Sequence, residues 1–203
     1  MSIAPFHLER YFAQYEFSAR YLLSSSDCES LSMQDLLGMA DTETTGMWEE
    51  LKLGYTESWG HPLLREEIAR LYSGIDQAGV LTAVPEEGIY LTMRALLKPG
   101  DHIICTFPGY QSLYEVARSM GCEVSYWEPD EEQGWKFPIA ELEKKMRSST
   151  TLVVVNFPHN PTGFAPGEEE FVSRVERVSG QGAYLLSVEM YRFLEVEPGR
   201  TVP

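Results

Sequence analysis

Apolar and polar positions follow two different patterns along this chain and divide it into two regions. Residues 6–20 carry aromatic side chains at helical spacing and residues 31–40 carry three leucines, so both stretches are predicted to be helices. The stretch 41–46, Asp-Thr-Glu-Thr-Thr-Gly, is polar and breaks the periodicity, which indicates a domain boundary. We therefore expect one region over residues 1–45 and a second over residues 46–203.

The second region begins with an amphipathic helix. Pro62 suits a first helical turn, because its missing N–H costs nothing there. Leu64, Ile68, Leu71 and Tyr72 follow at i, i+4, i+7 and i+8, on one helical face. Further helical patterns lie near residues 87–97, 110–120, 138–147 and 168–179.

Short apolar runs alternate with these helices. They are predicted to be strands over residues 80–84, 102–106, 123–127, 152–155 and 183–187. Alternation at this spacing predicts an α/β fold, a mostly parallel sheet with helices on both faces. Nearly continuous apolar runs are typical of strands that are buried on both sides.

The composition of the chain restricts the classes of partner and the compartment that we expect. The formal charge of −15 argues against nucleic acid and anionic membranes, because phosphate surfaces require Lys and Arg. Cys28, Cys105 and Cys122 have no Cys-x-x-Cys spacing and fit a reducing cytoplasm. The amino terminus carries no basic-then-apolar secretion signal, and no apolar run approaches the length of a membrane helix. We expect a cytoplasmic protein.

Candidate ligand-binding residues follow the ends of the predicted strands. Ligands of an open parallel sheet bind at the carboxyl ends of its strands. Taken singly, each position is weak; Asn-Pro-Thr-Gly alone could be a turn. The positions that follow successive strands are Glu86-Glu87, Pro108-Gly109-Tyr110, Asn160-Pro161-Thr162-Gly163 and Val188-Glu189-Met190-Tyr191.

Taken in order, these positions resemble the class I/II pyridoxal-phosphate aminotransferases of fold type I. Five segments carry the resemblance: 54–65, 96–101, 108–110, 156–163 and 187–192. It implies an amino-terminal arm with part of a small domain over residues 1–45, and an incomplete cofactor-binding large domain over residues 46–203. The family's sheet continues beyond the fifth strand, and its later strands lie between the fifth and the first. We therefore expect the first strand, residues 80–84, to remain unpaired.

The resemblance also implies roles for individual residues. Tyr110 would stack on the pyridine ring, and Asn160 and Tyr191 would hydrogen-bond the phenolic oxygen of pyridoxal phosphate. Tyr55 would reach the phosphate of a partner subunit's cofactor, which implies a homodimer. The substrates of a complete relative would be an amino acid and a 2-oxo acid.

Val188 departs from the family pattern. The family carries an aspartate here that pairs with the pyridine nitrogen and keeps the ring protonated. Valine cannot accept that bond, and Glu189 cannot replace it, because adjacent strand residues point to opposite faces.

The residues at the expected phosphate-binding turn depart from the family pattern as well. The family shows a small-residue turn whose free amides bind phosphate at a helix start. Here Pro85 offers no N–H, and Glu86 and Glu87 would repel phosphate. Acidic residues at a first helical turn are also ordinary capping chemistry, so both interpretations of these glutamates remain open.

The family's Schiff-base lysine has no counterpart among these residues. No lysine follows Lys145, and Lys52, Lys98, Lys136 and Lys144 are predicted to be solvated surface residues. We therefore expect no catalytic residue in this chain, and non-covalent, weak cofactor binding at best. The four histidines show no zinc-type spacing, so no metal site is expected.

These observations predict a truncated aminotransferase that is inactive alone, and leave the enzyme question open. A complete relative would transfer an amino group between an amino acid and a 2-oxo acid. The alternatives are a catalytically dead scaffold, half of a split enzyme that needs a partner chain, and a decayed gene product.

Overall fold

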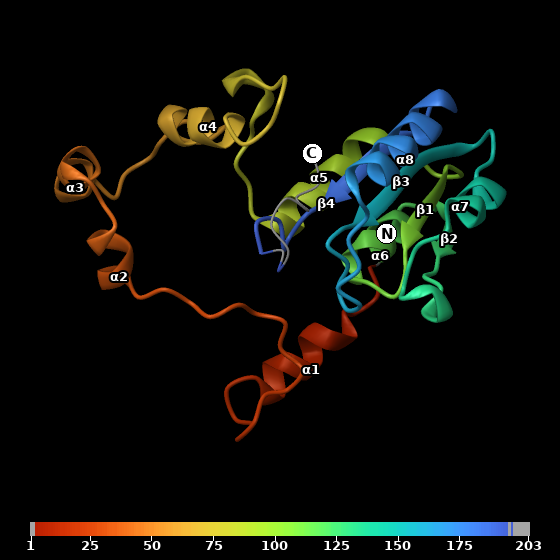
Figure 1. Ribbon diagram of the computed structural model, residues 1–203, viewed down its shortest axis with the longest axis horizontal. Coiled ribbons are helices and arrows are strands. Elements are labelled where there is room, and N and C mark those ends of the chain that lie inside the picture. The colour runs from red at the N-terminus through yellow and green to blue at the C-terminus, as the bar shows by residue number, and fades with distance from the viewer. Residues whose placement is uncertain (1–2, 195, 197–203) are drawn as a thin grey trace.

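A parallel four-stranded sheet forms the centre of the computed structural model, which describes residues 3–194 and 196 (Figure 1). The strand order is β2-β1-β3-β4. Each strand pairs in parallel with its neighbours, with Ile104 opposite both Ser125 and Val153. The strands are β1 (His102–Thr106), β2 (Glu123–Trp127), β3 (Thr150–Asn156) and β4 (Tyr184–Val188).

Helices cover both faces of this sheet, as the sequence predicts. On one face, Ile103 and Val154 pack with residues of α5 (Pro85–Leu96) and α6 (Ser112–Ser119). On the other face, Ile104 and Val153 pack with residues of α7 (Ile139–Lys145) and α8 (Glu168–Gly180). Successive strand residues thus enter opposite cores, which is why β1 and β3 are apolar throughout their centres.

The predicted strand over residues 80–84 is not part of the sheet. Val80 and Val84 have extended backbone conformations, but no ladder joins this segment to another in the described chain. An extended segment becomes a strand only where a neighbour accepts its hydrogen bonds. The strand assignment was wrong: the Thr82 N–H donates to the Trp59 carbonyl at 3.0 Å, but the described residues form no ladder here. Leu81 and Val84 are accordingly more than half exposed.

The amino-terminal third runs away from the sheet as a chain of short helices (Figure 1). None of the first three contains a buried residue. The helices are α1 (His7–Tyr15), α2 (Met33–Gly38), α3 (Thr42–Glu49) and α4 (Pro62–Ala69), and the chain also has short 3-10 turns η1 (Gln77–Gly79) and η2 (Glu131–Gln133).

The polar stretch 41–46, predicted to interrupt the periodicity, lies mostly in α3. Asp41 caps this helix, because its Oδ1 accepts a hydrogen bond from the Thr44 N–H at 2.8 Å. The stretch is helical without a periodic pattern because a helix with no buried face does not need an apolar stripe, and the domain boundary near it stays a prediction. The helices expected over residues 6–20 and 31–40 are shorter in the structure, as α1 and α2, and neither contains a buried residue.

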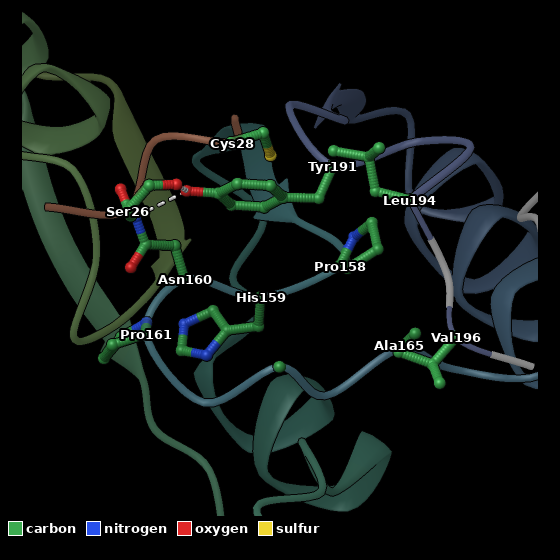
Figure 2. A pocket seen from close by; sticks show the side chains of 11 residues that line it. Ser26, Cys28, Pro158, His159, Asn160, Pro161, Ala165, Tyr191, Leu194 and Val196 are labelled. Carbon is green, nitrogen blue, oxygen red and sulfur yellow. Dashed lines mark hydrogen bonds between the residues drawn. The ribbon is translucent and has the colours of Figure 1, made fainter. Parts of the chain in front are cut away.

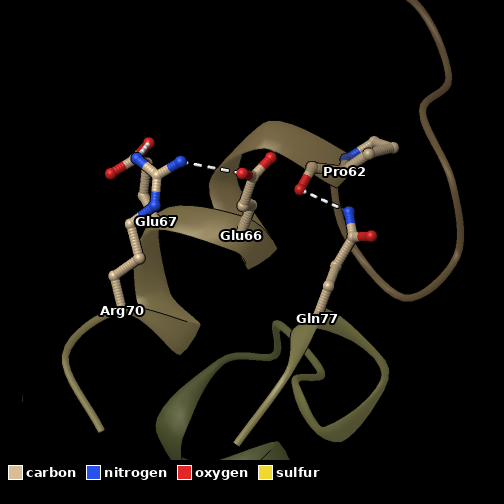
Figure 3. A network of polar contacts seen from close by, with 5 residues as sticks. All are labelled: Pro62, Glu66, Glu67, Arg70 and Gln77. Carbon is tan, nitrogen blue, oxygen red and sulfur yellow. Dashed lines mark hydrogen bonds and ion pairs between the residues drawn. The ribbon is translucent and has the colours of Figure 1, made fainter.

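A polar network holds η1 against α4 before the chain enters α5 (Figure 3). The side-chain amide of Gln77 donates to the Pro62 carbonyl at 2.6 Å. Arg70 pairs with Glu66 at 2.8 Å and with Glu67, and these groups are largely exposed. Exposed pairs of this kind contribute between zero and about 1 kcal/mol, whereas the partly buried Arg65 guanidinium joins α4 to η1 by donating to the Gln77 carbonyl at 2.6 Å.

No helix in the described residues is long and apolar enough to cross a membrane.

Candidate functional site

The loop after β1 places Tyr110 at the carboxyl edge of the sheet. A Cβ added to Gly109 would approach the Thr106 carbonyl oxygen to 3.2 Å, which explains the glycine immediately before the tyrosine. Tyr110 lies just before α6 and is 39% exposed, so one part of its ring faces outward. It lines a cavity of about 430 Å³ together with Asn160.

The loop after β3 places Asn160 beside the same edge. The loop closes on itself through a hydrogen bond from the Gly163 N–H to the His159 carbonyl at 2.7 Å. Gly163 has φ +73°, a left-handed conformation that glycine adopts without strain. The family-like sequence therefore fixes a tight turn here, and its asparagine stands at the turn's tip.

His159 connects these two loops. Its Nε2–H donates to the Pro108 carbonyl at 2.8 Å, and its Nδ1 accepts from the Thr162 hydroxyl at 2.7 Å. The ring is 1% exposed, and burial lowers its pKa from the ordinary value, so it remains neutral. Sequence reasoning tested this histidine only for metal spacing; its partner Pro108 lies too far along the chain for any local pattern to reveal.

Asn160 and Tyr191 converge, as the resemblance implies. The Asn160 side-chain amide lies 3.3 Å from the Tyr191 hydroxyl, although the residues come from loops after different strands. Both line a cavity of about 490 Å³ (Figure 2). Parallel strands end at the same edge, so this meeting follows from the sheet topology. Asn160 thus stands between Tyr110 on one side and Tyr191 on the other.

The amino-terminal arm reaches into this site, a contact that the sequence did not predict. The Tyr191 hydroxyl lies 3.4 Å from the Ser26 carbonyl, and the Asn160 amide lies 3.5 Å from the Ser26 hydroxyl (Figure 2). The Tyr110 hydroxyl donates to a Glu9 carboxylate oxygen at 2.6 Å. This hydrogen bond, followed by burial and nearby negative charge, raises the pKa of Tyr110 above its ordinary value.

The remaining predicted site residues are less tightly placed. Glu86 accepts a hydrogen bond from the Ser112 hydroxyl at 3.1 Å, and burial is the main cause that raises its pKa. Glu87 lies in the exposed first turn of α5, and Tyr55 is fully exposed. Among the described residues, no hydrogen bond joins Glu87 or Tyr55 to the cavity residues. The structure therefore brings Tyr110, Asn160 and Tyr191 together with Glu86 nearby, and leaves the other two apart.

A pyridoxal ring fits only part of this edge. The two donors Asn160 and Tyr191 suit a phenolic oxygen, and Tyr110 supplies an aromatic face beside them. The phosphate end does not fit: α5 begins at Pro85, which lacks an N–H, and its first turn is acidic. At the expected position of the ring-nitrogen contact stands Val188, which has no polar group.

The lysines of the described residues lie away from this edge. None of the five lysines lines either of the two cavities in the described structure, and Lys144 pairs with Glu141 at 2.6 Å on the surface of α7. Among these same residues, no group of three or more His, Cys, Asp and Glu side chains is placed to hold a metal ion. The edge can bind and orient an aromatic ring, but it offers no amine nucleophile.

Comparison with known proteins now gives the family. The sequence model described as "Aminotransferase class I and II" matches residues 48–200. An aspartate aminotransferase of Sulfurisphaera tokodaii is 30% identical over 71% of this chain and 38% of its own length. A capreomycidine synthase of Streptomyces vinaceus is 30% identical over 88% of this chain and 46% of its own length.

Solved structures agree with this assignment. A PLP-dependent aminotransferase from Streptococcus suis superposes on the whole chain with a TM-score of 0.87 at 30% identity, and the match covers 55% of that protein. The chain thus spans about two fifths to one half of the length of these relatives. On the strength of the family match and the structural superposition, this chain belongs to the class I and II aminotransferase family.

Proposed function

We propose that this chain provides the ring-binding half of a pyridoxal-phosphate site and binds the cofactor weakly and without a covalent bond. The observation that carries the proposal is the 3.3 Å contact between the Asn160 amide and the Tyr191 hydroxyl, beside Tyr110. The complete protein would transfer an amino group between an amino acid and a 2-oxo acid. By itself, the part described here would not.

Each side chain has a distinct task in this proposal. The Asn160 N–H and the Tyr191 O–H donate to the phenolic oxygen of the cofactor, and Tyr110 stacks on its ring. When bound, the cofactor supplies an electron-withdrawing ring for amino-group chemistry. Tyr55 contacts the cofactor phosphate of a second subunit, and its full exposure in one chain supports that role.

Two features of the site limit its affinity for pyridoxal phosphate. Glu86 and Glu87 stand where a phosphate would need free amides, although Glu87 can also be satisfied by its place at the positive end of the α5 dipole. Val188 leaves a pyridinium ring without a counter-charge, and an unpaired charge is costly in a partly dry site. We therefore place the dissociation constant in the range typical of weak ligands, on the order of 1 mM.

A second candidate function is half of a split enzyme, or a scaffold without activity. The exposed apolar side chains of the arm favour a partner: Phe17 and Leu23 are 95% and 93% exposed. A second subunit or a complementing chain that carries the lysine would cover them and supply the missing amine. In this proposal the protein is dimeric and cytoplasmic, with an arm over residues 1–45 and the large domain over residues 46–203. Its three free cysteines support the reducing location.

The test is a binding titration of the purified chain with pyridoxal phosphate, followed by absorbance. We expect weak saturable binding, and a dissociation constant about fivefold higher in Asn160→Ala and in Tyr191→Phe, because each variant loses one hydrogen bond. Tyr184→Phe is the matched control, because Tyr184 is exposed on β4 away from both cavities. Equal affinity in all four proteins would refute the site. An absorbance band that survives dialysis and disappears on borohydride treatment would refute the non-covalent mode.

A further inference from the structure

The amino-terminal arm holds the polar groups that the candidate site would offer to a ligand. The Tyr110 hydroxyl donates to a Glu9 carboxylate oxygen at 2.6 Å. The Tyr191 hydroxyl lies 3.4 Å from the Ser26 carbonyl, and the Asn160 amide lies 3.5 Å from the Ser26 hydroxyl (Figure 2). Each of these three site side chains is therefore bonded to the arm, and a ligand that needs the same donors must compete with it.

Two short segments of the arm make these contacts, and both also line the cavities of the site. Residues 6–9 line the cavity of about 430 Å³. Ser26 and Cys28 line the cavity of about 490 Å³. We call residues 5–9 and 24–28 the latch. Each cavity loses part of its lining when the latch moves.

The latch is held by contacts that water can replace. Glu9 and Ser26 are both exposed, and α1, which carries most of the first segment, contains no buried residue. A further contact is again polar, because the His7 N–H donates to the Gln111 side chain at 3.0 Å. Segments with few buried apolar contacts open locally at a small fraction of the free energy of global unfolding. The latch can therefore leave the site while the sheet stays folded.

The latch also sets the charge of the site. The hydrogen bond to Glu9 is the main cause that raises the pKa of Tyr110, and the negative charges of Glu9, Glu86 and Asp27 act in the same direction. Among the residues that the structure describes, no lysine or arginine lines either cavity. A docked latch thus adds two carboxylates to an edge that is already acidic, which disfavours an anion there.

We propose that the latch is an autoinhibitory element, which while docked closes the ring-binding site to aromatic ligands that carry an anionic oxygen. The inference rests on the proposed function, because it concerns the regulation of the same site. Two effects act together: the latch accepts the hydrogen bonds that an anionic oxygen would accept, and its carboxylates repel that oxygen. The apparent affinity is the intrinsic affinity reduced by the fraction of chains in which the latch is open.

The direction of a mutational effect separates this role from its opposite. An autoinhibitory latch competes with the ligand, so a substitution that loosens it tightens binding. A latch that supplies ligand contacts of its own would give the reverse, because loosening it would weaken binding. Glu9→Ala removes the acceptor of the Tyr110 hydroxyl together with one charge, whereas Asp27→Asn removes one charge alone.

The probe is 4-nitrophenolate, a coloured aromatic ring with an anionic oxygen and no phosphate. Its absorbance is titrated with the full chain at a pH where the probe is ionised. We expect about threefold tighter binding in Glu9→Ala than in the wild type, and a smaller gain in Asp27→Asn. Glu16→Ala is the matched control, because Glu16 follows α1 on the same arm and lines neither cavity. Its affinity should equal that of the wild type.

Hydrogen exchange of the full chain reports the latch directly. Saturating probe should accelerate exchange at the His7 amide, which the docked latch protects through Gln111. Circular dichroism checks that each variant folds, and Asp27→Asn gives a second reading should Glu9→Ala unfold.

Three results would overturn the latch while leaving the site in place. They are equal or weaker binding by Glu9→Ala, a gain of the same size in Glu16→Ala, and exchange at His7 that the probe leaves unchanged. Probe binding that Tyr191→Phe does not weaken, or no binding by any of these proteins at millimolar concentration, would overturn the ring-binding site and the latch together.

Discussion

The sheet and the amino-terminal arm use apolar residues in opposite ways. In the sheet, Leu152 and Val153 are fully buried on successive positions of β3, one in each core. In the arm, Phe17 and Leu23 are 95% and 93% exposed, and α1 to α3 have no buried residue. Both regions carry apolar side chains, but only one of them removes these side chains from water.

The difference shows that an apolar pattern is not itself a source of stability. Burial yields about 25 cal/mol for each Å² of apolar surface removed from water, and the arm removes little. Helices as short as α2 (Met33–Gly38) are marginal without tertiary packing. Within the described chain, the arm is held at its edges, for example by the His7 N–H bond to the Gln111 side chain at 3.0 Å. Its conformation therefore depends on a few polar contacts, whereas that of the sheet depends on two cores.

A pair of leucine substitutions gives the largest expected contrast. Leu152→Ala opens a cavity under α5 and α6 and should lower the free energy of unfolding by about 2–5 kcal/mol. Leu23→Ala, the matched change at an arm position that is 93% exposed, should alter it by less than about 0.5 kcal/mol. Urea unfolding followed by circular dichroism measures both. Comparable losses in the two variants would mean that the arm is packed in solution, against this chain or another copy.

The buried histidine between the two site loops should make the sheet region sensitive to mild acid. Burial lowers the pKa of His159 in the folded chain below the value of about 6.5 expected when it is unfolded. Between these two values the unfolded state binds a proton that the folded state does not, so stability falls as the pH drops below about 6.5. The slope contributed by this group is at most about 1.4 kcal/mol per pH unit. His102, buried in β1, has its pKa lowered by burial as well and adds in the same direction.

His159→Gln should reduce that slope and lower stability at neutral pH, because the glutamine cannot hold both Pro108 and Thr162 in the same geometry. His61→Gln, at the exposed start of α4, is the matched control and leaves both buried histidines in place. The measurement is the free energy of unfolding at several pH values between about 7.5 and 5.5. A slope that His159→Gln leaves unchanged would show that this histidine takes up its proton without unfolding.

The sequence predicts the sheet better than the arm, for a physical reason. β1 (His102–Thr106) and β2 (Glu123–Trp127) begin and end at the predicted residues, because each is a short β-prone run that follows a turn with a glycine, Gly100 or Gly121, at positive φ. Residues 80–84 carry an equally good strand pattern, yet they join no ladder in the described chain. α3 carries no pattern and still forms, capped by Asp41. Pairing and capping depend on neighbours, which periodicity does not encode.

Some contacts of the candidate site could likewise be predicted from the sequence, and others could not. The meeting of Asn160 with Tyr191 could be predicted, because both follow parallel strands and the strands end at one edge. The contacts of Ser26 and Glu9 could not, because the arm approaches the site from more than a hundred residues away with no local signal. The pairing of Asn156 with Val188 across the ladder could not be predicted either, because register is not visible in a single strand.

The smallest expected effect concerns the contact by which the arm touches the site. Glu9→Gln removes the charge that accepts the Tyr110 hydroxyl, so the pKa of Tyr110 should fall toward its ordinary value. The phenolate band in the ultraviolet, compared with that of Tyr110→Phe to isolate one tyrosine, measures this change. The free energy of unfolding should be almost unaltered, because the pair lies at a partly exposed edge where water replaces the lost bond. A pKa of Tyr110 that Glu9→Gln leaves unchanged would mean that α1 does not rest on the site in solution, and that the sheet alone orients Tyr110.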